Sequence, residues 1–313
     1  MGNGKNKSVK HLTKEILMVK KYLSLVKFSH TIFALPFAFI GFFMGVFEFS
    51  IAKALPMATV ILQKQMLQLF LLVLVCMVTA RSAAMAFNRY LDRSFDAKNP
   101  RTAIREIPSG VIAASSALRF VILNAVIFMA ATYYINPICF YLSPVALFVI
   151  LFYSYTKRFT ALCHMVLGLG LSLAPIGAYL AVTGSFAVLP ILFSCIVICW
   201  VSGFDIIYAM QDVDFDASQN LHSIPTYLGK VNALRLSVLL HVVAAVLVVV
   251  AGLQAGYGYF YWEGALVFIG MLYYQHSIVS PTNLSKVNIA FMTANGIASV
   301  IFGIHVLVAL FLK

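Results

Sequence analysis

Charge is scarce in this 313-residue chain. Only 10 % of its residues are Asp, Glu, Lys or Arg, and 62 % are hydrophobic, with a mean hydropathy of +0.95. Soluble domains usually carry about 25 % charged residues, because their polar surface must face water. So many apolar side chains do not fit inside one soluble core, and the composition excludes a soluble globular protein. It predicts a polytopic membrane protein.

Cysteine chemistry and the motifs of common soluble enzymes are also missing. The five cysteines lie inside apolar runs and none forms a CxxC pair, which argues against disulfides and zinc. There is no GxSxG nucleophile elbow and no glycine-rich phosphate loop. The histidines do not cluster in sequence, and we expect isolated helix positions for these four: His164, His241, His276 and His305.

What the chain does contain is a series of long apolar runs. About 20 apolar residues cross the hydrocarbon of a bilayer, and nine runs qualify: 28–47, 67–88, 111–134, 137–155, 160–182, 187–210, 231–253, 258–276 and 288–311. The eighth is the weakest because Glu263 interrupts it. The expected fold is an all-α bundle of nine transmembrane helices, with residues 28–313 as one domain. Residues 1–27 form a basic segment that either lies at the membrane interface or is a solvated tail.

The net charge of +12 predicts an orientation rather than a nucleic-acid partner. Basic residues gather in the N-terminal segment and after spans two, four, six and eight, at Arg89, Arg93, Lys98, Arg101, Arg105, Lys157, Arg158, Lys230 and Lys286. The opposite loops contain little beyond Lys53 and Lys64. The positive-inside rule places the N-terminus and the even-numbered loops in the cytoplasm. We therefore expect a multi-pass plasma (inner) membrane protein.

Two acidic motifs end spans two and six, on the same predicted side of the membrane. Asn88, Asp92 and Asp96 follow one another at four-residue steps, and Asp212 and Asp216 repeat the step. This spacing places side chains on one face of a helix. Carboxylates at the membrane usually face a wet cavity and mark a substrate or ion site. Oxygen donors suit Mg²⁺, which proteins commonly share with substrate phosphates. The pair of motifs therefore predicts a Mg²⁺ site for a diphosphate, although one such motif alone is often only a helix-end charge pair.

Basic and aromatic side chains near these motifs are candidates to bind the diphosphate. We expect Arg101 and Arg105 to hold phosphate oxygens. Arg93 and the neighbouring Arg89 point away from the motif face, so either a site role or a topology role fits them. At the end of span four, Tyr153 and Lys157 either donate to the leaving diphosphate or form an ordinary aromatic belt and basic anchor.

Two further charged residues lie deeper in the predicted bundle. Arg81 and Asp205 each precede a motif residue, Asn88 or Asp212, by seven positions, which is about two helical turns. They either form an ion pair that links spans two and six or support the residues that bind a substrate.

The motifs resemble those of a known family, the UbiA superfamily of intramembrane prenyltransferases. The first motif is similar to its NxxxDxxxD, followed by the basic stretch Arg101-Thr102 and Arg105-x-x-Pro108-Ser109-Gly110, and Asp212-x3-Asp216 is similar to its second motif. Within the superfamily the chain is most similar to 4-hydroxybenzoate polyprenyltransferases and related enzymes of a menaquinone route. One departure is Arg89, which stands where relatives often carry an acidic residue.

The resemblance implies a site and a reaction. It implies that Mg²⁺ is held by Asn88, Asp92, Asp96, Asp212 and Asp216. The groups expected to bind the diphosphate are Asn88, Tyr153, Lys157 and Arg101, and those expected to act in catalysis are Asp92, Asp212, Arg101 and Arg105. The implied reaction is Mg²⁺-dependent transfer of a polyprenyl group from polyprenyl diphosphate to 4-hydroxybenzoate or a naphthoate in ubiquinone or menaquinone biosynthesis.

Other readings of the same residues remain open. A UbiA-type enzyme could use another acceptor, such as haem, a chlorin or a glycerol phosphate lipid. A cation-coupled transporter would also contain carboxylates in a helical bundle, but here they lie at helix ends beside arginines. We expect the lipid bilayer and the two substrates as partners, without nucleic acid and with no protein partner inferred.

Overall fold

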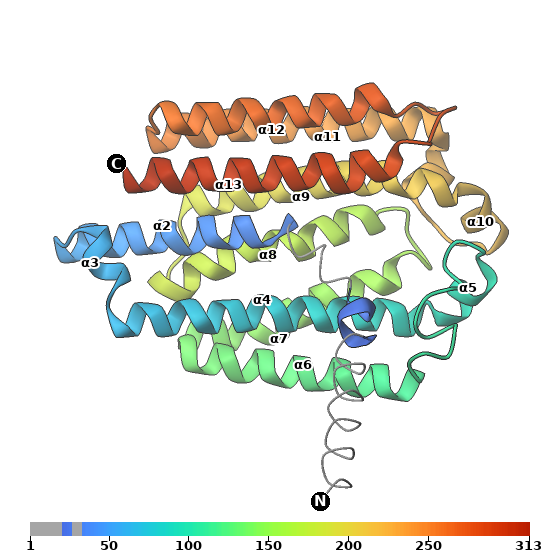
Figure 1. Cartoon of the computed structure of the whole chain (residues 1–313), viewed down its shortest axis with the longest axis horizontal. Helices are drawn as coiled ribbons and strands as arrows, with labels where there is room; N and C mark the ends of the chain where they lie inside the picture. The colour runs from blue at the N-terminus through green and yellow to red at the C-terminus, as the bar shows by residue number, and fades with distance from the viewer. Residues whose placement is uncertain (1–20, 27–32) are drawn as a thin grey trace, which may run out of the picture.

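A computed structural model describes residues 21–26 and 33–313, and these ranges form a bundle of long helices (Figure 1). The long helices are α2 (Leu35–Lys53), α4 (Lys64–Leu91), α6 (Ala114–Ile135), α7 (Pro137–Thr156), α8 (Cys163–Thr183), α9 (Val188–Ala209), α11 (Ile224–Ala255), α12 (Tyr259–Ile278) and α13 (Asn295–Phe311), which the π-helical turn η3 (Ile289–Ala294) precedes. The short elements are α3 (Met57–Ile61), α5 (Arg93–Lys98), the 3₁₀ turn η2 (Met210–Asp212) and α10 (Val213–Ser218).

The all-α bundle of nine long helices confirms the prediction for the described part of the chain. Eight of the helices are long and apolar enough to cross a membrane. α12, which contains Glu263, is outside this set, yet it runs beside α13 and also packs against α11. The first helix begins later than predicted, at Leu35, with a proline in its first turn where no backbone donor is needed. Residues 28–32 of that predicted span lie outside the described residues.

The long helices pack in a closed order. Contacts run from α2 to α4, α6, α7, α8, α9, α11, α12, α13 and back to α2, and α2 also packs along α8. In Figure 1 the helices lie side by side, with α5 and α10 together at one end and α3 at the other. The loops that carry the two acidic motifs are therefore neighbours, although they are more than a hundred residues apart in sequence.

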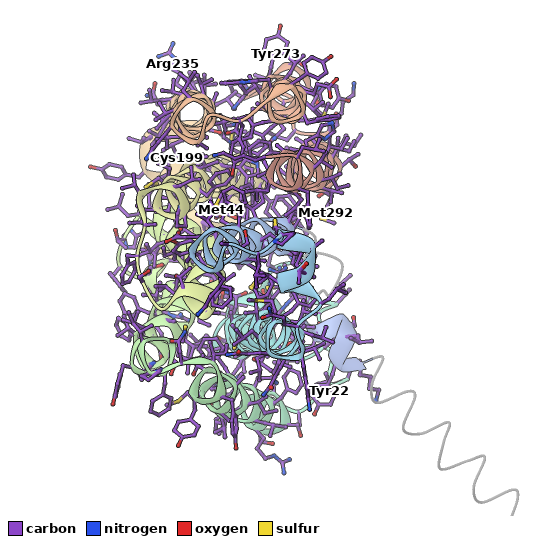
Figure 2. The ribbon with its side chains drawn as sticks, turned by 90° about the vertical axis from the view of Figure 1, so that its left-hand side faces the viewer. Tyr22, Met44, Cys199, Arg235, Tyr273 and Met292 are labelled. Atoms are coloured by element: carbon purple, nitrogen blue, oxygen red, sulfur yellow. The ribbon has the colours of Figure 1, made fainter. Side chains whose placement is uncertain are left out.

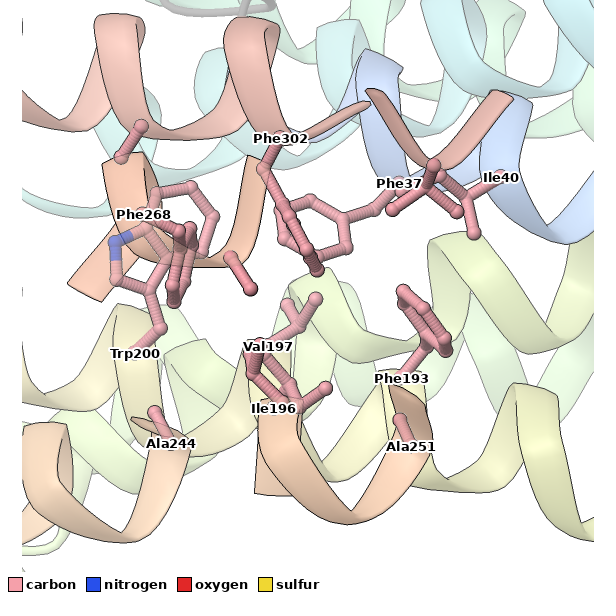
Figure 3. Close-up of a cluster of buried hydrophobic side chains, with 14 of the residues drawn as sticks. Phe37, Ile40, Phe193, Ile196, Val197, Trp200, Ala244, Ala251, Phe268 and Phe302 are labelled. Carbon is pink, nitrogen blue, oxygen red and sulfur yellow. The ribbon is translucent and has the colours of Figure 1, made fainter. Parts of the chain in front are cut away.

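The bundle is apolar both inside and outside. Its largest core cluster contains buried Phe37, Phe193, Trp200 and Phe302 (Figure 3). Many outward-facing side chains are also large and hydrophobic. Tyr273, which points away from the bundle in Figure 2, is 77 % exposed. An apolar exterior of this extent is suited to lipid, where helices satisfy their own backbone hydrogen bonds.

Glycines let particular helices approach closely. A Cβ added at Gly168 of α8 would lie 2.5 Å from the Ser202 Oγ of α9, and one at Gly41 of α2 would overlap the Pro175 carbonyl of α8. Gly229 has a different role, because its φ of 75° separates the first turn of α11 from the rest of the helix. The predicted seventh span, which begins at 231, corresponds to the helix after this break.

Part of the predicted basic segment packs against the bundle. Leu25 is fully buried in a cluster that includes Ala83 of α4. The ring of Tyr22 stacks on Phe120 of α6 at a centroid distance of 4.8 Å. The rest of the segment, which carries most of its lysines, lies outside the described residues.

A hollow of about 240 Å³ opens near the ends of α2 and α13 that lie opposite α5 and α10. Its lining is mainly apolar and includes Met44 and Leu310. The charged motifs therefore lie at the other end of the bundle from this hollow.

Candidate active site

The first motif is built across a break between two helices. α4 carries Asn88 and ends at Leu91, and Asp96 lies in the short α5. Between them Asp92 has φ −85° and ψ 4°. The four-residue hydrogen bonding nevertheless continues, from Asp92 N to Asn88 O at 2.9 Å and from Asp96 N to Asp92 O at 2.7 Å. The Asn88 amide also donates to Asp92 Oδ2 at 3.2 Å. Asn88, Asp92 and Asp96 therefore stay close together, as predicted, although the helix is not continuous through them.

The second motif repeats this construction. α9 ends at Ala209, Asp212 closes the 3₁₀ turn with φ −105° and ψ 5°, and α10 carries Asp216. Asp92 and Asp212 thus both occupy the sparsely populated bridge region of backbone space, where many active-site residues lie. Each is followed by a six-residue helix. The two motifs are therefore similar in backbone conformation as well as in sequence.

Each motif carboxylate is paired with a basic side chain. The pairs and their N–O distances are Asp92–Arg158 at 3.1 Å, Asp96–Arg105 at 2.7 Å, Asp212–Arg101 at 2.5 Å and Asp216–Lys157 at 2.7 Å. Arg101 follows the first motif, Asp212 belongs to the second, and Lys157 and Arg158 directly follow α7. These contacts therefore bring three separate helix ends together. The structure brings the predicted motifs and their bases together in one site.

Arg101 makes the most extensive of these contacts. Its Nε and Nη2 donate to the two oxygens of Asp212 at 3.1 and 2.5 Å, and its Nη1 donates to the Tyr208 hydroxyl at 3.1 Å. The Asn99 amide donates to the same carboxylate at 3.4 Å. Burial lowers the pKa of the Arg101 guanidinium, but the charge of Asp212 raises that pKa above its ordinary value. Arg101 therefore stays charged and joins the first loop to the second motif.

Several motif oxygens are buried without a hydrogen-bond donor. Asp96 is 5 % exposed, and its Oδ2 has no hydrogen-bond partner among the described residues. Asp216 is fully buried, and neither of its carboxylate oxygens accepts a well-directed hydrogen bond, although Lys157 Nζ lies 2.7 Å from one of them. Burial raises the pKa of the Asp92 carboxyl to about 6, and the charge of Arg158 opposes that rise. Buried oxygens of this kind are unfavourable until a donor or a cation approaches them.

These carboxylate oxygens are suitable ligands for Mg²⁺, but they do not form a complete coordination sphere. Among the described residues no group of three or more His, Cys, Asp and Glu side chains lies close enough to hold a metal ion. Mg²⁺ is usually bound by one or two carboxylates, with water and substrate phosphates as the other ligands. The arrangement therefore suits a metal that arrives together with an anionic substrate.

The predicted pair at the end of α7 reaches the site in two ways. The carbonyl of Lys157 accepts the backbone N–H of His222 at 2.7 Å, which ties the loop after the second motif to α7. Burial lowers the pKa of the Lys157 ammonium, but Asp216 raises that pKa above its ordinary value. Tyr153 lies one helical turn before Lys157 in α7. Lys157 thus contacts the second motif, and Tyr153 lies one turn deeper in the bundle.

The two uncertain arginines of the first motif have different surroundings. Arg89 is 5 % exposed and lies within electrostatic range of Asp96, Glu106 and Arg105. Arg93 is exposed and donates to the carbonyl of Tyr90 at 2.6 Å. Arg89 therefore belongs to the interior of the site, and Arg93 lies outside it.

Two contacts correct the expectations for the deeper groups. Asp205 does not pair with Arg81 but with His164, whose Nδ1 lies 2.6 Å from Asp205 Oδ2. His241 and His276 are not isolated either, because their ring nitrogens lie 2.9 Å apart. No sequence spacing indicates these pairs, since each joins residues on different helices.

Arg158, like Asn99 and Tyr208, is a site residue that the sequence motifs do not predict. It donates to Asp92 and to the carbonyl of Leu91, both at 3.1 Å. Its sequence signal was its position directly after Lys157 at the same helix end.

With this geometry established, comparisons with known proteins identify the family. Residues 35–297 match the model of the UbiA prenyltransferase family. The chain belongs to this family. A 4-hydroxybenzoate octaprenyltransferase of Shewanella pealeana is 28 % identical over 236 residues, which are 75 % of this chain and 82 % of that protein. One from Tolumonas auensis is 31 % identical over 71 % of this chain and 77 % of that protein.

Solved UbiA structures share the fold. A UbiA homolog from Aeropyrum pernix K1 superposes with a TM-score of 0.77 and 28 % identity, over 89 % of this chain and 97 % of that one. A UbiA homolog from Archaeoglobus fulgidus, solved with DMAPP and Mg²⁺, gives a TM-score of 0.71 at 20 % identity, over 93 % and 99 % of the two chains. The UbiA fold therefore extends over almost the whole chain.

Proposed function

We propose that this UbiA-family protein catalyses the Mg²⁺-dependent transfer of a polyprenyl group from polyprenyl diphosphate to the ring of an aromatic acid, 4-hydroxybenzoate or a naphthoate. The observation that carries the proposal is the meeting of two acidic motifs and four basic side chains at one end of an apolar bundle. The names of the relatives, and the DMAPP and Mg²⁺ bound to the Archaeoglobus homolog, support it.

The four acid–base pairs support a proposal for how the donor binds. Arg101, Arg105, Lys157 and Arg158 balance the charges of four aspartates. We propose that the carboxylates of Asp92, Asp96, Asp212 and Asp216, with Asn88, take up Mg²⁺, and that the released bases turn to phosphate oxygens. When bound, Mg²⁺ supplies charge neutralisation at the leaving diphosphate. The bases turn to the phosphate when the donor binds, so they are in place before that charge develops.

Aromatic rings lie beside the second motif, where the allylic group of the donor would ionise. Tyr208 is one turn from Asp212, and its ring centroid lies 4.3 Å from that of Phe291. Phe291 in turn contacts Phe33 and Phe204. Ring faces stabilise a nearby cation, and their apolar surroundings limit attack by water. We propose that this aromatic cluster faces the allylic cation as the diphosphate leaves.

The carboxylate of the acceptor needs a cationic partner, and Arg81 fits this role best. Arg105 is engaged by Asp96, and Lys27 lies outside the described residues. Arg81 Nε is buried and has no hydrogen-bond partner within the described part of the chain. A buried donor of this kind gains from a charged acceptor. We propose that Arg81 binds the carboxylate and so directs the ring toward the aromatic cluster.

Purified protein with Mg²⁺, a long-chain polyprenyl diphosphate and a panel of hydroxybenzoates and naphthoates tests the function. We expect formation of a prenylated aromatic product. EDTA should abolish this product formation, and added Mg²⁺ should restore it. Asp212→Asn should reduce turnover at least a hundredfold, because one carboxylate oxygen and its charge are lost. Asp214→Asn is the matched control, since this exposed neighbour in α10 should retain full activity. Magnesium-independent product formation, or no product with any acceptor, would contradict the proposal.

A further inference from the structure

His164 and Asp205 form a polar pair inside the bundle. Neither residue has a role in the reaction proposed above. The imidazole Nδ1 of His164 lies 2.6 Å from Asp205 Oδ2. The two side chains differ in access, because that of His164 is 4 % exposed and that of Asp205 is 22 % exposed. The pair therefore has a buried imidazole behind a partly accessible carboxylate.

Close packing of α8 against α9 brings the two residues together. His164 lies in the first turn of α8, and its carbonyl accepts a hydrogen bond from Ser202 Oγ at 3.1 Å. One turn later is Gly168, where any Cβ would lie 2.7 Å from the Ile198 carbonyl. The short distance between these backbones lets a side chain as short as aspartate reach the imidazole.

The pair lies at the level where an acceptor ring would meet the donor. Asp205 precedes Asp212 by seven residues, which is about 10 Å along a helix. Arg81 precedes Asn88 by the same seven residues, on α4. Asp205 on α9 and Arg81 on α4 therefore lie at about the same depth below the two motifs.

We propose that His164 is a positioning residue: it holds the Asp205 carboxylate so that its free oxygen accepts the hydrogen bond of the acceptor's ring hydroxyl. The inference rests on the proposed function, in which Arg81 binds the carboxylate at the other end of the acid. A hydroxyl that donates to a carboxylate gives electron density to its ring, and the ring carbon beside it becomes a better nucleophile. The pair thus selects aromatic acids with a ring hydroxyl.

The physical role of His164 is to keep the Asp205 carboxylate charged and to orient its second oxygen toward the substrate. A carboxylate that is largely enclosed in an apolar bundle is unfavourable unless it is hydrogen-bonded or paired with a charge. The imidazole N–H supplies that bond from the buried side and leaves the other oxygen for the substrate. Without the imidazole, the carboxylate would rotate toward other donors or take up a proton, and the hydroxyl would lose its acceptor.

The experiment compares His164→Leu, His164→Asn and Asp205→Asn with the wild-type protein in the Mg²⁺-dependent assay. Leucine removes the hydrogen bond, whereas the asparagine amide places a donor close to the position of Nδ1. We expect His164→Leu and Asp205→Asn to raise the KM of the aromatic acid, or lower its kcat/KM, at least tenfold while the donor KM stays within twofold. His164→Asn should recover most of this loss.

The second readout is discrimination between 4-hydroxybenzoate and 4-methoxybenzoate, which cannot donate the hydrogen bond. Wild type should prefer the hydroxyl compound, and His164→Leu and Asp205→Asn should reduce that ratio several-fold; a merely structural pair would leave it unchanged. An unchanged donor KM shows that each variant is folded. This inference would be wrong, and the proposed function would stand, if the wild type is active but both Asp205→Asn and His164→Leu leave the acceptor KM unaltered. The preference for 4-hydroxybenzoate over 4-methoxybenzoate would then also be unaltered in both variants. Wild type that prenylates no aromatic acid would overturn the proposed function and this inference with it.

Discussion

At the scale of single residues, the site is a set of balanced charges rather than an acidic pocket. The motif aspartates were predictable because they repeat at four-residue steps in a chain with few other carboxylates. Their partners were partly predictable, since Arg101, Arg105 and Lys157 lie near the motifs in sequence. The partner of Asp92 was not, because Arg158 looks like one of several topology-setting bases.

Arg158→Ala should show how much the pairing of Asp92 contributes. Arg158 is about one-quarter exposed and holds both the carboxylate and the Leu91 carbonyl at the helix break. We expect kcat/KM for the prenyl donor to fall at least about tenfold, which corresponds to about 1.4 kcal/mol. Steady-state assays over a range of donor concentrations measure this effect. Arg93→Ala is the control, because Arg93 is exposed and, within the described part of the chain, its hydrogen bond and its ring contact are both with Tyr90. Equal losses in the two variants would argue against a specific role for Arg158.

At the scale of elements, the two motifs share one construction: a long helix, an aspartate in bridge-region geometry and a six-residue helix. The sequence indicated the repeat but predicted a continuous helix face. The break at the central aspartate turns each short helix across the end of the bundle. Neighbouring helices then decide which side chains meet, and glycines decide how closely they approach.

Gly168→Ala should loosen the contact between α8 and α9. The added Cβ would lie 2.5 Å from Ser202 Oγ and 2.7 Å from the Ile198 carbonyl, so the helices must separate. We expect destabilisation of about 1–3 kcal/mol, seen as a lower melting temperature in detergent. Gly177→Ala is the matched control in the same helix, because no atom lies within 4 Å of its added Cβ. It should leave the melting temperature unchanged or raise it, since alanine favours helix. Equal destabilisation by both substitutions would contradict the packing argument.

At the scale of the whole molecule, all four acid–base pairs lie at one end of the bundle, so the orientation in the membrane decides which compartment supplies the acceptor. The concentration of lysine and arginine in the loops at this end indicates the cytoplasm. We propose that the aromatic acid enters from the cytoplasm while the isoprenoid tail of the donor stays among the lipids.

Cysteines introduced at exposed positions can test this orientation. Ser218 follows the second motif, and Ser185 lies in the loop between α8 and α9 at the opposite end. A membrane-impermeant thiol reagent should label Ser218→Cys in inverted vesicles and Ser185→Cys in right-side-out vesicles. The unsubstituted protein gives the background from its own cysteines, all of which lie within helices. The reverse labelling pattern would place the site on the other side of the membrane.

The sequence by itself determined the class of protein, the helices of the bundle, the two acidic motifs and the end at which they meet. These properties follow from local composition and spacing, because apolar length, charge position and helical period are set by neighbouring residues. Only the tertiary structure decided which base neutralises which aspartate, that Arg89 is buried while Arg93 is exposed, and that Asp205 pairs with His164. Those contacts depend on distances between helices that are far apart in sequence, and small residues such as Gly168 set these distances through packing.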